Sequence, residues 1–152
     1  MFEIKIEGVE ELKAAIAAGA QQLVKDVRQA AAHSAQVATR QIKALAPVKT
    51  GDLRKSVEPH LRPTPNGSIG NITVGEDYAS HVVDGTKPHR IEAKNAKALR
   101  FEVGGRVMLR RAVQHPGTKP NDFVTPGVTE GQQVLDHDAA QAVAKLKRTI
   151  EG

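Results

Sequence analysis

The sequence predicts an α+β fold: a long N-terminal helix packed on an antiparallel β-sheet, with a projecting hairpin and a C-terminal helix. Three observations predict it. Apolar residues recur every three or four positions from Val9 to Leu45, which is helical periodicity. The middle of the chain consists of short apolar segments separated by clusters of Gly, Pro and Asn, as in strands joined by turns. Helical periodicity then returns beyond Thr125.

Composition limits the class of protein. At 152 residues the chain is expected to form one domain, 1–152, with a modest core. Aromatic residues make up only 3%, so the core must be built from Ala, Val, Leu and Ile. There is no cysteine, which excludes disulfides and thiolate metal sites. No apolar run approaches the roughly 18 residues of a membrane span, and residues 1–8 lack the apolar centre of a secretory signal. We therefore expect no membrane partner and folding in a cytoplasm.

The chain should begin with a strand and a long helix. Residues 2–7 alternate apolar and charged side chains, the period of a half-buried strand, and Gly8 would end it. The helix that follows would run roughly 55 Å if it is unbroken. Gly19 costs it about 1 kcal/mol relative to Ala, so a kink or a split at this position stays open. The apolar stripe comprises Leu12, Ile16, Ala20, Leu23, Val27, Ala31, Ala35, Ala38, Ile42 and Leu45.

A corner at residues 46–56 separates this helix from the strands. Pro47 cannot continue a helix, and Thr50 and Gly51 supply turn chemistry. We expect residues 53–61 to form a strand, residues 62–68 an exposed loop, and residues 69–74 a strand that pairs back as a hairpin. Residues 78–83 form a short apolar element of undetermined type, and residues 84–89 are turn-rich.

Residues 99–113 predict a second hairpin with Gly104 and Gly105 at its tip. A two-residue turn would pair Phe101 with Met108. A three-residue loop would instead pair Phe101 with Val107, and would set Glu102 opposite Arg106. We favour the three-residue loop, because it matches apolar with apolar side chains and acid with base.

The favoured register would place Arg100 and Arg110 near each other on one exposed face. Residues 115–122 are not expected to form regular structure. The final helix should start with Thr125 as its N-cap and Pro126 in its first turn. Its apolar stripe is Val128, Leu135, Ala139, Val143, Leu146 and Ile150, and cations in its last turns complement the helix dipole.

No pattern in the chain supports catalysis. The six histidines lack the spacing that places two metal ligands on one helical face. No Ser lies in a nucleophile turn, and neither Gly104-Gly105 nor Gly67 is followed by a phosphate-binding sequence. We expect no enzyme, no cofactor and no metal.

Basic residues concentrate in two blocks. Residues 40–62 hold six basic and two acidic side chains, and residues 87–119 hold nine and two. Such blocks could contact nucleic acid phosphates without reading sequence, or could pair with acidic surfaces of a neighbouring subunit. No zinc finger, helix-turn-helix or ribonucleoprotein motif decides between these alternatives.

Three blocks of the sequence together resemble a known family. The first is Ala46-Pro47-Val48-Lys49-Thr50-Gly51-Asp52-Leu53-Arg54-Lys55-Ser56 after a long helix. The second is Tyr78-Ala79 through Asp84-Gly85-Thr86. The third is His115-Pro116-Gly117-Thr118 through Phe123-Val124-Thr125-Pro126. In this order they are similar to the signature of bacteriophage head–tail joining proteins, the neck or tail-completion proteins of long-tailed double-stranded DNA phages.

The resemblance implies a structural virion protein, assembled in the host cytoplasm, that forms a homo-oligomeric ring (hexamer or dodecamer) at the head–tail junction. Its partners would be connector or stopper proteins on one side and tail tube or terminator proteins on the other. Double-stranded DNA would pass through the lumen without sequence recognition. A tail terminator that caps the tube is the nearest alternative, and a small basic nucleic-acid-binding protein is the alternative from another class.

The interface residues expected from this reading fall into three groups. The corner contributes Lys49, Thr50, Gly51, Leu53, Arg54 and Lys55. The second block contributes Asp84, Gly85 and Thr86. The second hairpin and the residues after it contribute Arg100, Arg106, Arg110, Arg111, His115 and Phe123.

Overall fold

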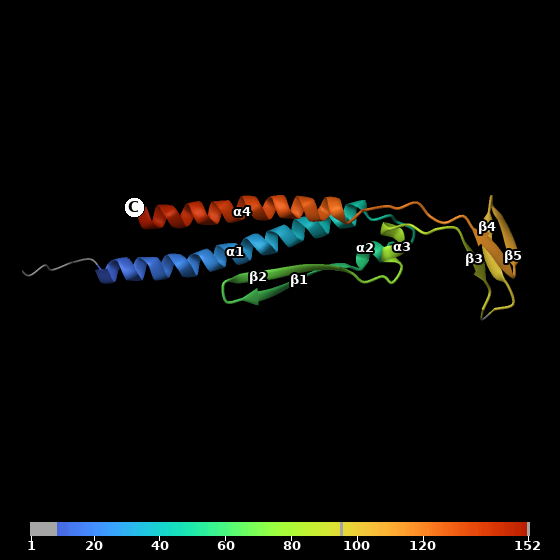
Figure 1. The fold of residues 1–152 in the computed structure, drawn as a ribbon, viewed down its shortest axis with the longest axis horizontal. Coiled ribbons are helices and arrows are strands. Elements are labelled where there is room, and N and C mark those ends of the chain that lie inside the picture. The colour runs from blue at the N-terminus through green and yellow to red at the C-terminus, as the bar shows by residue number, and fades with distance from the viewer. Residues whose placement is uncertain (1–8, 95, 152) are drawn as a thin grey trace, which may run out of the picture. The chain divides into compact units, whose positions relative to one another are not determined.

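The computed structural model describes residues 9–94 and 96–151, so the strand expected at residues 2–7 lies outside the described residues. The chain divides into two compact units (Figure 1). The helical unit contains the chain up to Glu76 together with the chain from Phe123 onward. The loop unit is Asp77–Asp122. The α+β class is confirmed, and the strands among the described residues form three separate two-stranded antiparallel sheets.

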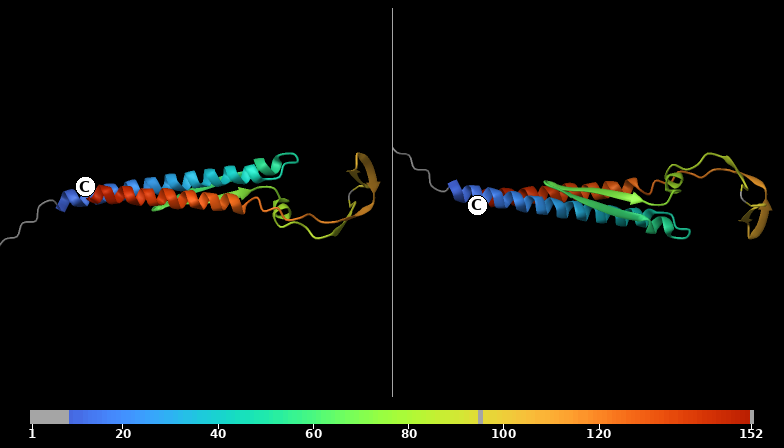
Figure 2. Two further views of the ribbon diagram at one scale, coloured as in Figure 1. Left: turned by 90° about the horizontal axis from the view of Figure 1, so that it is seen from above. Right: turned by 90° about the horizontal axis from the view of Figure 1, so that it is seen from below.

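Two long helices lie side by side in the helical unit: α1 (Val9–Leu45) and α4 (Thr125–Glu151) (Figures 1 and 2). Helix α1 continues without a break through Gly19, so the unbroken alternative is the correct one. It ends where Pro47 requires, and the Ala46 amide closes the last turn on the Ile42 carbonyl oxygen at 2.9 Å. Helix α4 begins at Thr125, the residue expected as its cap.

The two helices meet through small residues. A Cβ atom added to Gly127 would lie 2.5 Å from Cγ1 of Ile42, and one added to Gly131 would lie 2.7 Å from Cβ of Ala38. The Ser34 hydroxyl donates a 2.8 Å hydrogen bond to the Gly131 carbonyl oxygen. The missing side chains of the two glycines therefore allow this close contact between the helices.

We call the contact of Ala38 with Gly127 and Gly131 the small-residue seam. It determines which residues of each predicted apolar stripe are buried. In α1 the stripe is right at Ala35, Ala38 and Ile42, which are buried, but Leu45 after them is 43% exposed. Leu12 and Ile16 near the other end are 54% and 49% exposed. In α4 the buried positions are Gly127, Gly131 and Ala142, whereas Val128, Val143 and Ile150 of the predicted stripe are exposed.

The corner between α1 and the first hairpin contains a helical turn. Helix α2 (Asp52–Lys55) follows Gly51, whose φ of 91° is left-handed, and strand β1 (Val57–Thr64) starts only after it. The prediction of a strand from residue 53 is therefore wrong in its first residues. Backbone bonds from Lys55 to Gly51 and from Ser56 to Asp52 hold the turn. The turn places Leu53 in the core at 4% exposure.

The first hairpin is longer than expected. Strand β1 pairs with β2 (Gly67–Val74) from Val57–Val74 to Thr64–Gly67, so residues 62–64 and 67–68, predicted as loop, belong to the strands. The tip lies on α1, because the Arg28 guanidinium donates to the carbonyl oxygens of Gly67 at 3.0 Å and Thr64 at 2.6 Å. The core of this unit centres on Ile42, Val57 and Phe123, each at 1% exposure or less.

The described residues of the loop unit form one short helix and two small sheets. Residues 79–83 form helix α3 (Ala79–Val83), which settles the undetermined element. Strand β3 (His89–Glu92) pairs with β6 (Ala112–His115), a pairing that the sequence did not suggest. Strands β4 (Leu99–Val103) and β5 (Arg106–Arg110) form the expected second hairpin.

The register of the second hairpin differs from the favoured one. Phe101 lies opposite Met108, and Val103 lies opposite Arg106, which is the pairing of the two-residue turn. Gly104 and Gly105 have φ values of 57° and 77°. Positive φ at both central positions gives a turn whose twist matches the strands, and this backbone preference outweighs the side-chain pairing of the longer loop.

Candidate interface surfaces

The corner displays its cations outward. Lys49, Arg54 and Lys55 are exposed, while Leu53 between them is buried. The Thr50 hydroxyl bonds to the Asp52 carboxylate, and this carboxylate also lies 3.8 Å from the Lys55 ammonium. A buried anchor and a fixed turn thus hold a basic surface at one end of the hairpin. Leu53 itself belongs to the core, as does Phe123. Both residues therefore support the fold and are not exposed side chains that a partner could contact.

The second and third sequence blocks meet in the loop unit. The Thr86 and Thr118 backbones exchange two hydrogen bonds of 3.0 Å, and their hydroxyls lie 3.1 Å apart. Gly85 and Gly117 precede them with φ values of 70° and 85°. A Cβ on Gly85 would lie 2.5 Å from the Thr118 carbonyl oxygen, and one on Gly117 would lie 2.2 Å from the Thr86 carbonyl oxygen. Each glycine is therefore required by the close approach of the other Gly-Thr pair.

The hairpin arginines lie on both faces of the β4–β5 sheet. In the observed register Arg100 is opposite Leu109, and Arg110 is opposite Leu99. Because cross-strand partners share a face, Arg100 and Arg110 lie on opposite faces, and the prediction that they share one is wrong. Arg106 and Arg111 are also exposed. The hairpin is thus a thin basic element that can contact neighbours from either side.

His115 makes contacts within the loop unit. It lies opposite His89 in the β3–β6 pair, with ring centroids 5.1 Å apart. Its Nδ1 accepts a hydrogen bond from the Gly117 amide at 3.1 Å. His115 therefore supports the Gly117 turn that brings the two Gly-Thr pairs together.

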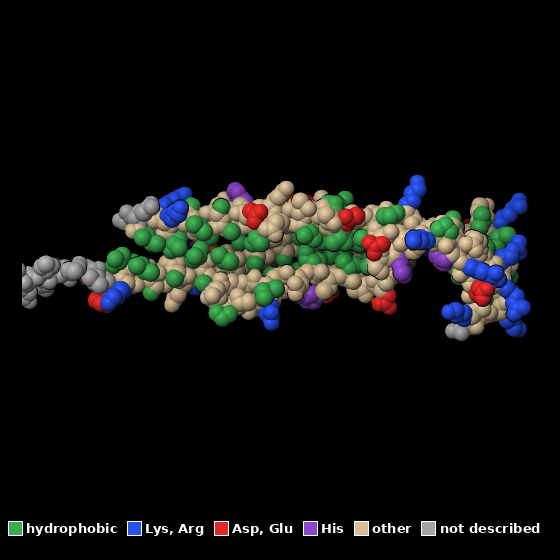
Figure 3. All heavy atoms as spheres, viewed as in Figure 1, with side chains coloured by type: hydrophobic (Ala, Val, Ile, Leu, Met, Phe, Trp, Pro, Cys, Tyr) green, Lys and Arg blue, Asp and Glu red, His purple; other side chains and the backbone are tan. Residues whose placement is uncertain are grey.

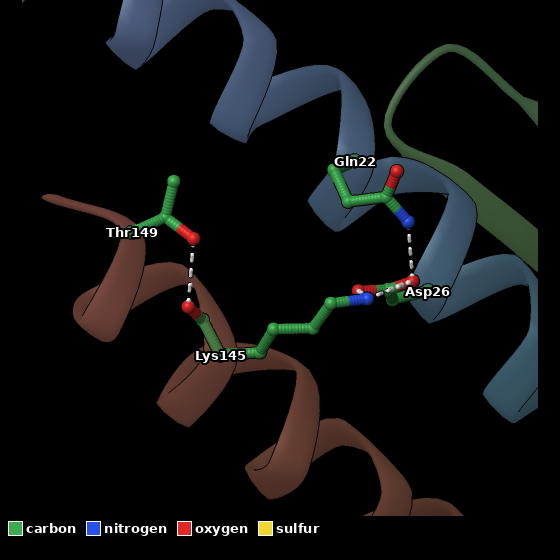
Figure 4. A network of polar contacts seen from close by, with 4 residues as sticks. All are labelled: Gln22, Asp26, Lys145 and Thr149. Carbon is green, nitrogen blue, oxygen red and sulfur yellow. Dashed lines mark hydrogen bonds and ion pairs between the residues drawn. The ribbon is translucent and has the colours of Figure 1, made fainter.

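Polar contacts join the long helices beyond the small-residue seam. The Lys145 ammonium lies 3.0 Å from the Asp26 carboxylate, and the Gln22 side-chain amide donates to the same carboxylate at 2.7 Å (Figure 4). The Gln22 hydrogen bond, followed by the contact with Lys145, lowers the pKa of Asp26. His33 and Asp138 make a second cross-helix contact at 2.7 Å. These contacts join the two long helices through paired polar side chains.

A groove runs along the hairpin side of the helix pair. It is bounded by α1, α4 and β2 and is lined largely by apolar side chains, including Ala31, Ala35, Ile72, Val128 and Leu135. Figure 3 shows hydrophobic side chains gathered along the seam between α1 and α4. The groove could not be predicted from any one stretch of the chain, because its walls come from three separate segments.

Among residues 9–94 and 96–151, no three His, Cys, Asp or Glu side chains gather as a metal site would require. Neither long helix, over the part that the structure describes, has an apolar stretch suited to crossing a bilayer. What the geometry offers is a set of contact surfaces: the basic corner, the basic hairpin and the apolar groove.

A family model described as "Bacteriophage HK97-gp10, putative tail-component" matches residues 10–107. The chain belongs to this HK97-gp10-like family. No curated protein and no solved structure matches it. The resemblance to phage head–tail joining proteins is thereby confirmed at the level of the family, and the chain is a phage tail-component-like protein.

The HK97-gp10-like match extends from the start of α1 into β5. It includes the corner and the Asp84–Thr86 segment, and it stops before the block that begins at His115. The Thr86–Thr118 contact nevertheless ties that last block to the matched part of the chain. Sequence reasoning missed the role of Gly127 and Gly131, although their four-residue spacing on one helix was a visible signal.

Proposed function

We propose that this chain is a structural virion protein that forms a ring at the phage head–tail junction, the neck, where it joins the portal-side connector to the tail and surrounds the DNA passage. It acts by binding and not by catalysis. The observation that carries the proposal is the family match over residues 10–107, which includes the basic corner.

The surfaces of the monomer support a role in assembly. The corner and the β4–β5 hairpin expose their cations, and nine basic side chains against two acidic ones lie in residues 87–119. In a ring, each subunit repeats the same heterologous contact with the next one until the ring closes. The corner would contact a neighbouring subunit or ring. The hairpin, basic on both faces, would contact an adjacent protein or the phosphates of DNA in the lumen.

Cryo-electron microscopy of intact particles tests this proposal. Density for the chain as a ring between the portal and the tail tube is the expected result. Absence of the chain from the head–tail joint would overturn the proposal.

A tail terminator is the second candidate, and the family description as a tail component favours it. The same reconstruction separates the two. A terminator would cap the last ring of the tail tube, whereas a neck protein would lie against the portal-side connector.

A further inference from the structure

The β1–β2 hairpin has two outer edges, and its hydrogen bonding shows which residues face each one. The Gly75 amide donates to the Ser56 carbonyl oxygen at 3.1 Å, so these two positions form a hydrogen-bonded pair. Bonded and non-bonded pairs alternate along antiparallel strands. Pro59–Ile72 and Pro63–Ser68 are therefore non-bonded pairs, and these residues direct their backbone groups outward.

The outer edge of β1 is closed to a further strand. Pro59 and Pro63 occupy positions whose amides would point outward, and proline has no amide hydrogen. The outer edge of β2 differs, since its outward positions are Ser68, Gly70, Ile72 and Val74, each with a donor and an acceptor. Among the described residues, no strand pairs with this edge. The hairpin can thus accept a strand at β2 alone.

The open edge of β2 borders the apolar groove described above. Ser68, Gly70, Ile72 and Val74 all line that groove, together with α1 and α4. A strand added there would bond to β2 along one side and rest one face on apolar side chains such as Ala35 and Leu135. Its other face would meet water, as do the exposed side chains of Ile69, Asn71 and Thr73 on β2. The site therefore calls for a short strand that is apolar on one face and polar on the other.

The sequence contains a segment with this alternating pattern at residues 2–7, outside the described residues. In residues 2–7, Phe2, Ile4 and Ile6 alternate with Glu3, Lys5 and Glu7. In an extended conformation the three apolar side chains share one face and the three charged ones share the other. This pattern fits the site, because the apolar face would lie on the groove and the charged face would meet water.

Residues 2–7 cannot reach the groove of their own copy. The hairpin tip at Gly67 lies against Val27, and the helix from Val9 to Val27 spans about 27 Å at 1.5 Å per residue. The residues from Gly8 back to Phe2 span at most about 25 Å when fully extended. Even Phe2 would end short of the tip, so residues 2–7 could occupy this edge only in another copy of the chain.

We propose that residues 2–7 of one copy add as a strand to the open edge of β2 in a neighbouring copy, with Phe2, Ile4 and Ile6 facing the groove. Repeated from copy to copy, this exchange is heterologous and supplies the subunit contact of a ring. In that respect it rests on the proposed function, although the exchange itself requires only two copies of the chain.

Disulfide trapping tests the exchange, because the chain has no native cysteine. Chains carrying Lys5→Cys are mixed with chains carrying Cys at one of three exposed β2 positions, Ile69, Asn71 or Thr73. His60→Cys is the matched control, since His60 lies opposite Asn71 on the closed edge of the same hairpin. We expect a mixed disulfide with at least one β2 position and none with His60→Cys. Equal trapping at His60, or no trapping at any β2 position, would overturn the proposal.

A pair of double variants tests the two faces of the segment. Ile4→Ser with Ile6→Ser should weaken self-association at least tenfold in light scattering, while Glu3→Ser with Glu7→Ser should leave it unchanged. Circular dichroism confirms that both variants retain their helices. If both double variants associate as the wild type does, strand exchange is wrong even when the chain is found at the head–tail joint. If the chain is absent from the joint, the proposed function fails, and the trapping result still decides the exchange.

Discussion

The Thr86 amide donates to the Thr118 carbonyl oxygen at 3.0 Å, and the Thr118 amide returns a 3.0 Å bond to the Thr86 carbonyl oxygen. This reciprocal pair joins two segments about thirty residues apart, each introduced by a glycine with positive φ. The Asn121 amide adds a 3.0 Å bond to the Val82 carbonyl oxygen at the end of α3. The backbone itself thus connects the two ends of the loop unit.

Replacing Gly117 should damage this connection. In Gly117→Ala the new Cβ would meet the Thr86 carbonyl oxygen at 2.2 Å, in addition to the strain of positive φ. Gly104→Ala is the control, because Gly104 also has positive φ but has no atom within 4 Å of the added Cβ. We expect Gly104→Ala to cost about 1 kcal/mol in unfolding free energy and Gly117→Ala at least twice as much. Equal losses in thermal unfolding would contradict the steric account.

The expectation of a single domain remains a prediction that the same experiment addresses. If the helical unit and the loop unit form one cooperative domain, Gly117→Ala should lower the temperature of one shared transition. Hydrogen exchange can follow amides of α1 and of β6 separately to check this. Loss of protection in β6 alone would indicate two independent domains.

The helix seam should be intolerant of one added methyl group. Gly131→Ala would bring the new Cβ to 2.7 Å from Cβ of Ala38, and the Ser34 backbone lies close beside it. We expect a loss of about 1–3 kcal/mol in unfolding free energy, although Gly→Ala normally stabilises a helix.

Gly19→Ala is the matched control for the seam. There the added Cβ meets only Cδ1 of Leu146, the far end of a flexible side chain, at 2.8 Å. This variant should be neutral or stabilising by up to about 1 kcal/mol. A denaturant titration that ranks Gly19→Ala below Gly131→Ala in stability would contradict the close-contact seam.

The Asp26 contact should make stability depend on pH. The Gln22 hydrogen bond and then the Lys145 contact lower the pKa of Asp26 in the folded chain. Its contribution to stability is therefore complete above the unfolded-state pKa of about 4 and is lost as the pH falls through the folded-state value. Asp26→Asn should be less stable than the wild type at pH 7, and the difference should shrink in acid. A difference that stays constant from pH 7 to pH 3 would show that the charge of Asp26 is not involved.

Charge reversal at the corner tests its role in assembly. Arg54→Glu should lower the yield of infectious particles at least about tenfold, because a rim charge of the wrong sign opposes docking. Lys25→Glu is the control, since Lys25 is an exposed cation of α1 away from the corner. The measurement is complementation of a phage that lacks the chain. Equal yields from both variants would show that the corner only connects α1 to the first hairpin and is not a docking surface.

The sequence predicted the long elements well, because a helical period over 37 residues of α1 is a strong signal. The prediction from sequence was wrong where a local backbone preference competed with the matching of side chains across a hairpin. At the second hairpin, two glycines with positive φ set the two-residue turn and left Glu102 opposite Val107. Leu53 illustrates the same limit, since one helical turn after Gly51 decided which way its side chain points.

The candidate surfaces were harder to predict than the fold. Exposed cations at the corner follow from the sequence, because charged side chains seldom enter a core. Phe123 was expected at an interface and is buried, because a large apolar side chain just before a helix can face either a partner or the core. The open edge of β2 required the strand register, which no single segment specifies.

The contact between Gly127 and Ala38 also has a practical consequence. The chain holds its two long helices together with its smallest side chains, and larger ones such as Leu12, Ile16 and Ile150 stay about half exposed. Exposed apolar side chains are a liability in a protein purified without its neighbours. The solubility of the isolated chain should therefore depend on its concentration. A dilute chain should stay in solution, and a concentrated one should either assemble with other copies or precipitate.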